Sequence, residues 1–330
     1  MYNRDVINLA EAVLGDENFR ISTAEACRLA ALPKEETLDL LMGANKIRQK
    51  FKQNKVVTCS ITNAKSGFCS ENCAFCAQSS HHETGIEPHP LLSEERLVGD
   101  ALQLYEKGAT EFSMVTSGFT LTDEELGRIG RAAGRIKEQT GLLLCSSLGV
   151  LTAVRAKQLK DSGLSAYHHN LETARSFFSQ VCTTHNYDDD VETVRIAKAA
   201  GLKVCCGGIL GLGESWEQRV ELAITLRDLD VDSIPINFLN PIAGTRMGAR
   251  PLLAPQEALK CIALFRFINP QKDITICGGR EVTLRDQQSW IFAAGANGLL
   301  IGNYLTTEGR DCRADMEMIK DLGLVAEQGC

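Results

Sequence analysis

The sequence has no apolar run that approaches the ~18 residues of a membrane-spanning helix, and its mean hydropathy of -0.09 is ordinary for a soluble globular protein. Its first segment, "MYNRDVINLAEAVLGDENF", lacks the basic start and the small-residue cleavage site of a secretory signal. Neither membrane insertion nor export is expected. We therefore expect a cytoplasmic protein without a membrane partner.

Clusters of basic residues are missing as well. The 35 lysines and arginines are scattered among 42 acidic residues, which gives a net charge of -7 and a pI near 5.5. Such a balance argues against nucleic acid as the main partner, because binding to phosphates needs concentrated positive charge. A small-molecule substrate is the better expectation.

Cysteine, in contrast, is plentiful, with 13 residues in a chain that we expect in a reducing compartment. Closely spaced cysteines there more often bind metal or carry out redox chemistry than form structural disulfides. Five are isolated and are expected to be ordinary packing or surface thiols: Cys27, Cys182, Cys261, Cys312 and Cys330. Metal binding is the leading hypothesis for the others.

Eight short β-branched or apolar segments alternate with amphipathic helical segments along the chain. The expected strands lie at 56–63, 111–117, 142–149, 166–172, 203–210, 233–240, 273–279 and 297–302. This alternation predicts an α/β fold, a (β/α)8 barrel of the TIM type. We expect the barrel over residues 53–305, a helical N-terminal extension over 1–52 and a C-terminal extension over 306–330.

An open, doubly wound sheet is the alternative fold. It would carry a glycine-rich dinucleotide loop after its first strand. The only candidate, "GGILGLGES" at 207–215, follows the fifth expected strand and departs from the required spacing. The barrel is therefore favoured.

Three cysteines, Cys69, Cys73 and Cys76, lie in "GFCSENCAFCAQSS" just after the first expected strand, where a barrel places its active-site loops. A zinc site would need a fourth ligand, and His81 and His82 follow too closely to be an obvious second half. A buried helical stripe of small hydrophobes is another alternative, although the glycine, serines and asparagine around the cysteines indicate a loop. A [4Fe-4S] cluster fits three thiolates best, because it leaves one iron open to a non-protein ligand.

Several motifs together resemble the radical S-adenosylmethionine (SAM) superfamily and, within it, the biotin synthase family. The C-x3-C-x2-C triplet, with aromatic Phe75 before its last cysteine, is similar to the superfamily signature. The motifs that resemble biotin synthases are "AQSS", "YHHNLET" at 167–173, "KVCCGGILGLGE" at 203–214 and "AGANGLLIG" at 294–302. The resemblance extends over roughly residues 50–310.

This resemblance implies a [4Fe-4S] cluster on Cys69, Cys73 and Cys76 whose open iron takes the amino and carboxylate groups of SAM. Reductive cleavage of SAM would give a 5'-deoxyadenosyl radical, which takes hydrogen from dethiobiotin so that inserted sulfur closes the thiophane ring of biotin. A low-potential electron donor (flavodoxin or ferredoxin) and a homodimer are implied in the same way.

The resemblance also implies which residues contact SAM. Phe75 would lie against the adenine, and Glu172 would accept hydrogen bonds from the ribose. Three glycines would let the backbone approach SAM closely, although ordinary turn glycines are the alternative: Gly207, Gly208 and Gly211. Where the family commonly has a SAM-contacting arginine, this chain has Asp190, which leaves the partner of the SAM carboxylate open.

Polar residues in the fourth and sixth expected strands are candidates for the substrate site. Asn170 and Asn237 match family positions that hydrogen-bond substrate or SAM, and a ureido ring would satisfy buried amides, as would a structural hydrogen bond. His168, where the usual family has asparagine, is either a substrate contact or a hydrogen-bonded core histidine.

Biotin synthases of the best-known type carry a second, auxiliary cluster, a [2Fe-2S] centre held by three strand cysteines and an arginine. This sequence retains Cys145 and Cys205 of that set but has Ser113 and Thr275 at the positions of the third cysteine and the arginine. Taken alone, these two substitutions would suggest that the sulfur-donating centre is lost.

The strands offer a replacement for that centre. Cys59, Cys145, Cys205 and Cys277 fall in the first, third, fifth and seventh expected strands, and alternate strands contribute the side chains of one interior layer of such a barrel. Strand alternation requires Cys206 to point outward if Cys205 points inward. We expect an auxiliary cluster of the [4Fe-4S] or [4Fe-5S] type on three or four of these thiolates. Packing as small buried hydrophobes is the alternative.

Three candidate functions are consistent with the sequence. Sulfur insertion into dethiobiotin is favoured by "YHHNLET", "AQSS" and the four strand cysteines. Another enzyme on the same scaffold, of the hydrogenase maturase or methylornithine synthase type, is the first alternative. A non-catalytic iron-sulfur or zinc protein is the second, and the glycine-rich turn and interior amides argue against it.

Overall fold

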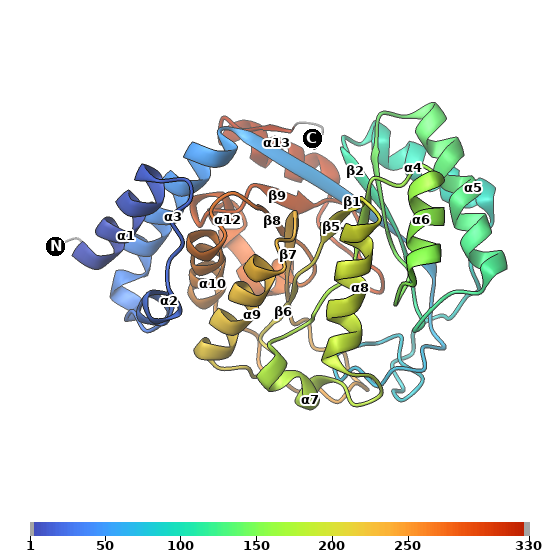
Figure 1. The fold of residues 1–330 in the computed structure, drawn as a ribbon, viewed down its shortest axis with the longest axis horizontal. Helices are drawn as coiled ribbons and strands as arrows, with labels where there is room; N and C mark the ends of the chain where they lie inside the picture. The colour runs from blue at the N-terminus through green and yellow to red at the C-terminus, as the bar shows by residue number, and fades with distance from the viewer. Residues whose placement is uncertain (1–2, 327–330) are drawn as a thin grey trace.

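A closed barrel of parallel strands forms the centre of the computed structural model, which describes residues 3–326 (Figure 1). Neighbouring strands pair in the order β1-β2-β3-β4-β5-β7-β8-β9, and β9 pairs back with β1, which closes the sheet on itself. This arrangement confirms the predicted (β/α)8 barrel.

The strands alternate with helices along the chain, as βα units require. The strands are β1 (Lys55–Lys65), β2 (Glu111–Thr116), β3 (Leu143–Ser147), β4 (Ala166–His168), β5 (Lys203–Cys205), β6 (Gly208–Leu210), β7 (Ser233–Phe238), β8 (Asp273–Ile276), β9 (Gly298–Leu300) and β10 (Val325–Ala326). The longer helices are α1 (Arg4–Gly15), α2 (Thr23–Ala30), α3 (Thr37–Lys52), α4 (Glu94–Glu106), α5 (Asp123–Gln139), α6 (Ala153–Asp161), α8 (Tyr187–Ala199), α9 (Trp216–Asp228), α10 (Pro255–Ile268) and α13 (Cys312–Asp321). Shorter helical turns are η1 (Lys34–Glu36), η2 (Arg175–Phe177), α7 (Phe178–Val181), α11 (Arg280–Leu284), η3 (Arg285–Gln287) and α12 (Trp290–Ala293).

The observed strands differ from the expected ones in extent, and two of the differences bear on the candidate site. The fifth is divided into β5 and β6, because Gly207 lies so close to β7 that a Cβ there would be 1.9 Å from the carbonyl oxygen of Pro235. The fourth ends at His168 instead of continuing to residue 172, and Glu172 has a left-handed φ of 61°, outside the strand region. Both departures lie at the end of the barrel that carries the candidate site.

Helix starts follow local sequence signals. Thr122 and Ser215 cap α5 and α9, and the side chains of Glu125 and Gln218 return to the backbone N–H of the capping residue. These capping boxes satisfy donors that the first helical turn leaves without intrahelical partners. The strands before these helices are therefore followed by short, well-defined connections.

The chain outside the barrel packs on its flank. Helices α1, α2 and α3 gather on one side of the molecule and pack against α9 and α10, where Lys260 Nζ donates to the carbonyl oxygens of Ala30 and Leu32 at 2.7 and 2.6 Å (Figure 1). Near the other terminus, α13 is tied to α11 by the fully buried pair Arg280 and Asp315, 2.5 Å apart. The division of the chain at residues 52 and 305 stays a prediction, and Cys330 lies outside the described residues.

Successive side chains of a barrel strand point alternately toward the surrounding helices and into the barrel interior. In β1 the residues that face the helices, such as Thr58 and Ser60, are fully buried, whereas Cys59 and Ile61 line an internal cavity. The same pattern places cysteine and polar side chains from the other strands inside the barrel. Within residues 3–326, no helix combines the length and apolar character needed to cross a membrane.

Candidate active site

The three-cysteine loop is folded by hydrogen bonds of its own. Cys69 N–H donates to the carbonyl of Gln78 at 3.2 Å, and Ser80 N–H donates back to the carbonyl of Cys69 at 2.8 Å. Cys76 N–H donates to the carbonyl of Cys73 at 3.0 Å. The "AQSS" residues thus close the loop, which keeps Cys69, Cys73 and Cys76 close together in space as well as in sequence.

These three cysteines share one cavity of about 200 Å³ at the end of the barrel. Asn170 and Glu172 line the same cavity. Burial raises the pKa of the Cys76 thiol to about 11, because the buried thiolate loses its hydration. Iron offsets such a penalty when it coordinates the thiolate, so the donor set fits an iron-sulfur cluster.

A second, larger cavity of about 490 Å³ occupies the barrel interior. Four cysteines line it, three of them within β1, β3 and β5 and one directly after β8: Cys59, Cys145, Cys205 and Cys277. Cys206 is fully buried in the barrel wall, on the face opposite to that of Cys205. The structure therefore brings the four strand cysteines to one space.

Burial is the largest influence on the pKa of each of the four interior thiols. Burial raises the pKa of Cys59 well above its ordinary value, and charge on Glu111, Cys277 and Cys145 would raise it further. For Cys205 the causes are burial and then charge on Cys145, Cys59 and Cys277. These raised pKa values keep the interior cysteines protonated unless a cation binds among them, and a cluster that takes thiolate ligands fits this donor set.

The two candidate amides line the barrel cavity but also hold backbone groups. Asn170 Oδ1 accepts from Gly207 N–H at 3.1 Å, and Asn237 Oδ1 accepts from Gly278 N–H at 2.9 Å. Asn237 Nδ2 donates to the carbonyl of Gly208 at 3.3 Å. Each amide side chain thus hydrogen-bonds with the backbone of a neighbouring segment of the barrel. Its contact with substrate stays a prediction.

His168, Asn170 and Glu172 line both cavities, and Phe75 lines the larger one. Burial lowers the pKa of His168 to about 4, so its imidazole is neutral. Burial, and next the charge of Asp190, raise the pKa of Glu172 to about 8. His168, Asn170 and Glu172 therefore lie where the cavity of the loop cysteines meets the cavity of the strand cysteines.

The three candidate glycines have packing reasons for their lack of a side chain. A Cβ at Gly208 would lie 2.5 Å from the carbonyl oxygen of Glu172, and Gly211 has a φ of +95°. Together with the close approach of Gly207 to β7, these contacts account for the glycines without SAM. A role in SAM binding stays a prediction for all three.

A polar constellation that sequence reasoning missed lies beside the loop cysteines. Asp190 Oδ1 accepts from His169 Nε2 at 2.8 Å, and Asp190 Oδ2 lies 3.3 Å from His185 Nε2. Burial alone would lower the pKa of His185, but hydrogen bonds to Asp190, Cys182 and Glu71 raise it to about 11. In the sequence, Asp190 stood out because it replaces an arginine that the family commonly has. No local pattern linked Asp190 to His169 or His185.

Cys182 is therefore not the isolated thiol that the sequence suggested. Its Sγ lies 3.3 Å from His185 Nδ1 and from Thr184 Oγ1. It also lines the cavity of the loop cysteines. Spacing along the chain did not reveal these contacts, because the partners of buried Cys182 include Asn72 of the distant three-cysteine loop.

Comparison with family models finds two matches along the chain. Residues 64–226 match the Radical SAM superfamily, and residues 235–325 match the Biotin and Thiamin Synthesis associated domain. The first match contains the loop cysteines together with Cys145 and Cys205, and the second contains Cys277.

Relatives with high identity cover almost the whole chain. The chain is 59% identical over 312 residues to the biotin synthase of Syntrophus aciditrophicus (strain SB), covering 94% of this chain and 96% of that protein. It is 52% identical over 329 residues to the biotin synthase of Geobacter metallireducens, covering 99% of each.

Solved structures are similar in fold at much lower identity. Methylornithine synthase superimposes with a TM-score of 0.84 at 19% identity, covering 97% of both chains. The FeFe-hydrogenase maturase HydG from Carboxydothermus hydrogenoformans gives 0.82 at 18% identity, covering 99% of this chain and 80% of that one. These likenesses extend to the fold alone.

Proposed function

The chain belongs to the biotin synthase family of radical SAM enzymes, and we propose that it inserts sulfur into dethiobiotin from an auxiliary cluster on four strand cysteines. The observation that carries this proposal is the convergence of Cys59, Cys145, Cys205 and Cys277 on the barrel cavity. The cluster would be of the [4Fe-4S] or [4Fe-5S] type, since four thiolates are available and the arginine position holds Thr275.

Cys69, Cys73 and Cys76 would hold the SAM-binding [4Fe-4S] cluster on the loop after β1. When bound, this cluster supplies the electron that cleaves SAM to methionine and a 5'-deoxyadenosyl radical. The three thiolates would leave one coordination position to SAM, and the loop that carries them is closed by backbone hydrogen bonds between Cys69 and residues Gln78 and Ser80.

The residues between the two cysteine groups would bind and orient the reactants. Phe75 would pack on the adenine of SAM, and Glu172 would accept a hydrogen bond from its ribose. Asn170, Asn237 and neutral His168 would bind the ureido ring of dethiobiotin, since all three line the cavity and offer donors and acceptors. The barrel wall around the cavity would limit the access of water to a reactive carbon radical and so protect it from other hydrogen donors.

The remaining expectations concern the enzyme's surroundings. We propose that a flavodoxin or ferredoxin supplies the electron, that two copies form a homodimer and that the enzyme acts in the cytoplasm. No nucleic acid or membrane partner is part of the proposal. The acidic pI near 5.5 supports the first of these exclusions.

The proposal is tested by anaerobic turnover of the reconstituted protein with dethiobiotin, SAM and a low-potential reductant. We expect both biotin and 5'-deoxyadenosine, measured by mass spectrometry. Deoxyadenosine without any biotin, with sulfide supplied, would favour another reaction on the same scaffold. A cluster spectrum that does not change when SAM is added would favour a non-catalytic iron-sulfur protein.

A further inference from the structure

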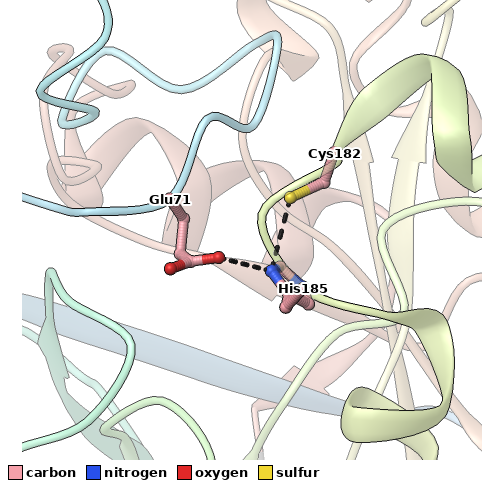
Figure 2. A group of neighbouring side chains, drawn as sticks. All are labelled: Glu71, Cys182 and His185. Atoms are coloured by element: carbon pink, nitrogen blue, oxygen red, sulfur yellow. Dashed lines mark hydrogen bonds and ion pairs between the residues drawn. The ribbon is translucent and has the colours of Figure 1, made fainter.

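Three side chains with metal-binding atoms converge beside the loop cysteines, in the cavity that Cys69, Cys73 and Cys76 line, and Cys182 also hydrogen-bonds with Cys73. Glu71 lies in the three-cysteine loop, and Cys182 and His185 lie in the segment between α7 and α8 (Figure 2). His185 Nδ1 lies 2.6 Å from Glu71 Oε2 and 3.3 Å from Cys182 Sγ, and the three donor atoms all lie within 4.8 Å of one another. The side chains of Glu71 and His185 are only 14% and 12% exposed, and Cys182 is buried.

The donor set selects a class of cation. One thiolate, one imidazole and one carboxylate suit Zn²⁺ and Fe²⁺, whereas Ca²⁺ and Mg²⁺ prefer oxygen ligands alone. Around a tetrahedral ion with bonds of ~2.0–2.3 Å, neighbouring donors lie ~3.3–3.8 Å apart. The sulfur-to-nitrogen distance between Cys182 and His185 already has this value. The carboxylate of Glu71 would have to withdraw by only about 1 Å, a shift that its flexible side chain allows.

A second layer of contacts orients the histidine for ligation. His185 Nε2 faces Asp190 Oδ2 at 3.3 Å, and Asp190 Oδ1 is fixed by His169 Nε2 at 2.8 Å. In the structure Nδ1 carries a proton that Glu71 Oε2 accepts, and a bound ion would replace this proton, while the proton on Nε2 would still satisfy Asp190. A carboxylate behind the ligating histidine is the usual arrangement in metal sites.

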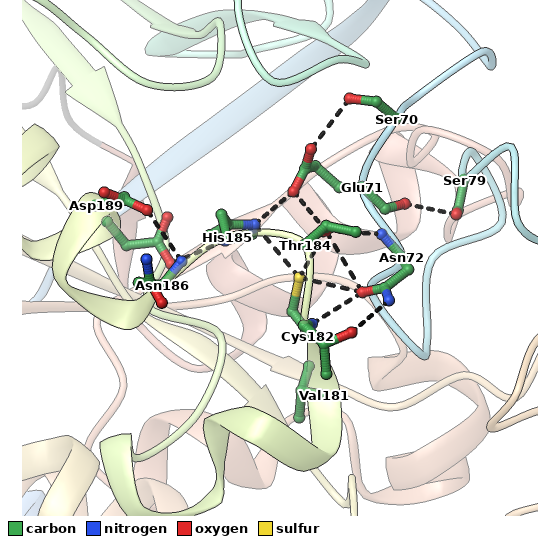
Figure 3. Close-up of polar contacts among 12 residues, drawn as sticks. Ser70, Glu71, Asn72, Ser79, Val181, Cys182, Thr184, His185, Asn186 and Asp189 are labelled. Atoms are coloured by element: carbon green, nitrogen blue, oxygen red, sulfur yellow. Dashed lines mark hydrogen bonds and ion pairs between the residues drawn. The ribbon is translucent and has the colours of Figure 1, made fainter.

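The backbone around the three residues is also tied together. Thr184 Oγ1 donates to Glu71 Oε2 at 2.6 Å, and Asn72 Oδ1 accepts from Thr183 N–H at 2.9 Å (Figure 3). Arg246 donates to the carbonyl of Asn72 at 2.7 Å. The two segments, more than 100 residues apart in sequence, are therefore already held at the distance that shared ligands require.

We propose that Glu71, Cys182 and His185 form a mononuclear site for a divalent transition metal ion, Zn²⁺ or Fe²⁺, that fastens the three-cysteine loop to the segment before α8. The mixed donor set separates this site from an iron-sulfur cluster, whose protein ligands are thiolates. Because Glu71 lies between Cys69 and Cys73, the bound ion orders the loop that carries the SAM-cluster cysteines. The proposal does not depend on sulfur insertion into dethiobiotin.

The test uses the reconstituted holoenzyme, in which iron-sulfur clusters would already occupy the loop and strand cysteines. Zn²⁺ is added anaerobically, the protein is desalted, and metal content and zinc X-ray absorption are measured. We expect one retained zinc per chain with one sulfur ligand and two or three nitrogen or oxygen ligands. In a parallel sample without zinc, added Fe²⁺ should give one additional high-spin ferrous signal in the Mössbauer spectrum.

Variants show whether the retained ion is at this site. Cys182→Ser and His185→Ala should lose the zinc, whereas Cys27→Ser, which changes a half-buried thiol of α2, should retain it. Glu71→Gln keeps the side-chain shape, so its weaker zinc binding cannot be attributed to unfolding. Asp190→Asn should weaken zinc binding roughly 10–100-fold, as expected for a residue that orients a ligand.

Three outcomes overturn the proposal. Neither zinc nor ferrous ion is retained beyond the cluster iron, or zinc is retained equally by Cys182→Ser, or the zinc shell contains three or four sulfurs. The last result would place the ion among the loop or strand cysteines. None of these readouts measures biotin, so their failure is distinguishable from failure of the proposed function.

Discussion

The two cysteine groups of this barrel are built in opposite ways. Cys69, Cys73 and Cys76 lie on one loop that is closed by its own backbone hydrogen bonds. Cys59, Cys145, Cys205 and Cys277 come from four strand positions, and only the register of the barrel brings them to one cavity. The first group is a local motif, whereas the second exists only in the folded barrel.

The difference teaches where each group is vulnerable. We expect that the loop cysteines can be altered without disturbing strand pairing, because they follow the end of β1 at Lys65. The strand group shares its scaffold with the hydrophobic wall, in which Cys206 is packed beside Cys205. A substitution in the barrel wall is therefore expected to shift the positions of the strand cysteines, even when no cysteine is substituted.

Removing the loop group should have the largest effect. With Cys69, Cys73 and Cys76 all changed to alanine, we expect neither 5'-deoxyadenosine nor biotin, because no thiolate remains to hold the SAM cluster. The thermal unfolding midpoint should stay close to that of the parent protein after both are stripped of iron. SAM cleavage by this variant at the parent rate would contradict the assignment.

Removing one member of the strand group should separate the two products. Cys277→Ala is expected to abolish biotin while 5'-deoxyadenosine still forms, since the loop cysteines are intact. Cys206→Ala is the matched control, because that thiol is buried directly after β5, outside the cavity, and its loss should cost about 1 kcal/mol of stability without loss of biotin. Biotin formation by Cys277→Ala at the parent rate would remove that cysteine from the auxiliary site.

A change in the wall should perturb the strand group without touching a ligand. In Gly207→Ala the new Cβ meets the carbonyl oxygen of Pro235, so β5 and β7 must separate, at a cost of about 1–3 kcal/mol. Denaturant unfolding measures this loss, and the spectrum of the auxiliary cluster should change with it. Gly134→Ala in α5, where no atom lies within 4 Å of the new Cβ, should instead stabilise the protein by about 1 kcal/mol. Equal stability of the two variants would contradict the packing account of Gly207.

The smallest effect is expected at the border between the two groups. Burial holds the pKa of His168 at about 4, so its imidazole gains a proton only below the range in which an ordinary histidine titrates. His168→Asn should therefore leave the shape of the pH–rate profile unchanged between about pH 6 and pH 9. Loss of an inflection near neutral pH in the variant would show that His168 titrates during turnover.

The sequence predicted the barrel well because its signals are local. Each strand is a short apolar segment bounded by turn residues, and the loop cysteines form a contiguous motif after β1. The odd-strand positions of Cys59 and Cys277 followed from counting those segments, and both thiols line the cavity as expected. Periodicity did not reveal the break at Gly207, since it depends on close contact with β7.

The group formed by Glu71, Cys182 and His185 could not have been predicted in this way. Cys182 has no neighbouring cysteine in sequence, and its polar contacts include Asn72, 110 residues away. Only the packing of the loop after β1 against the segment before α8 brings these residues together. The substitution at Asp190 marked the region as unusual, but its partners His169 and His185 are defined by three-dimensional structure.

The most direct test of the two-group account is the iron and sulfide content of the variant that lacks Cys69, Cys73 and Cys76, with ⁵⁷Fe Mössbauer spectra. The account predicts that one cluster remains after anaerobic reconstitution, and that adding Cys277→Ala disturbs its spectrum while adding Cys206→Ala does not. Absence of iron from the variant without the loop cysteines would contradict an auxiliary cluster on the strand cysteines.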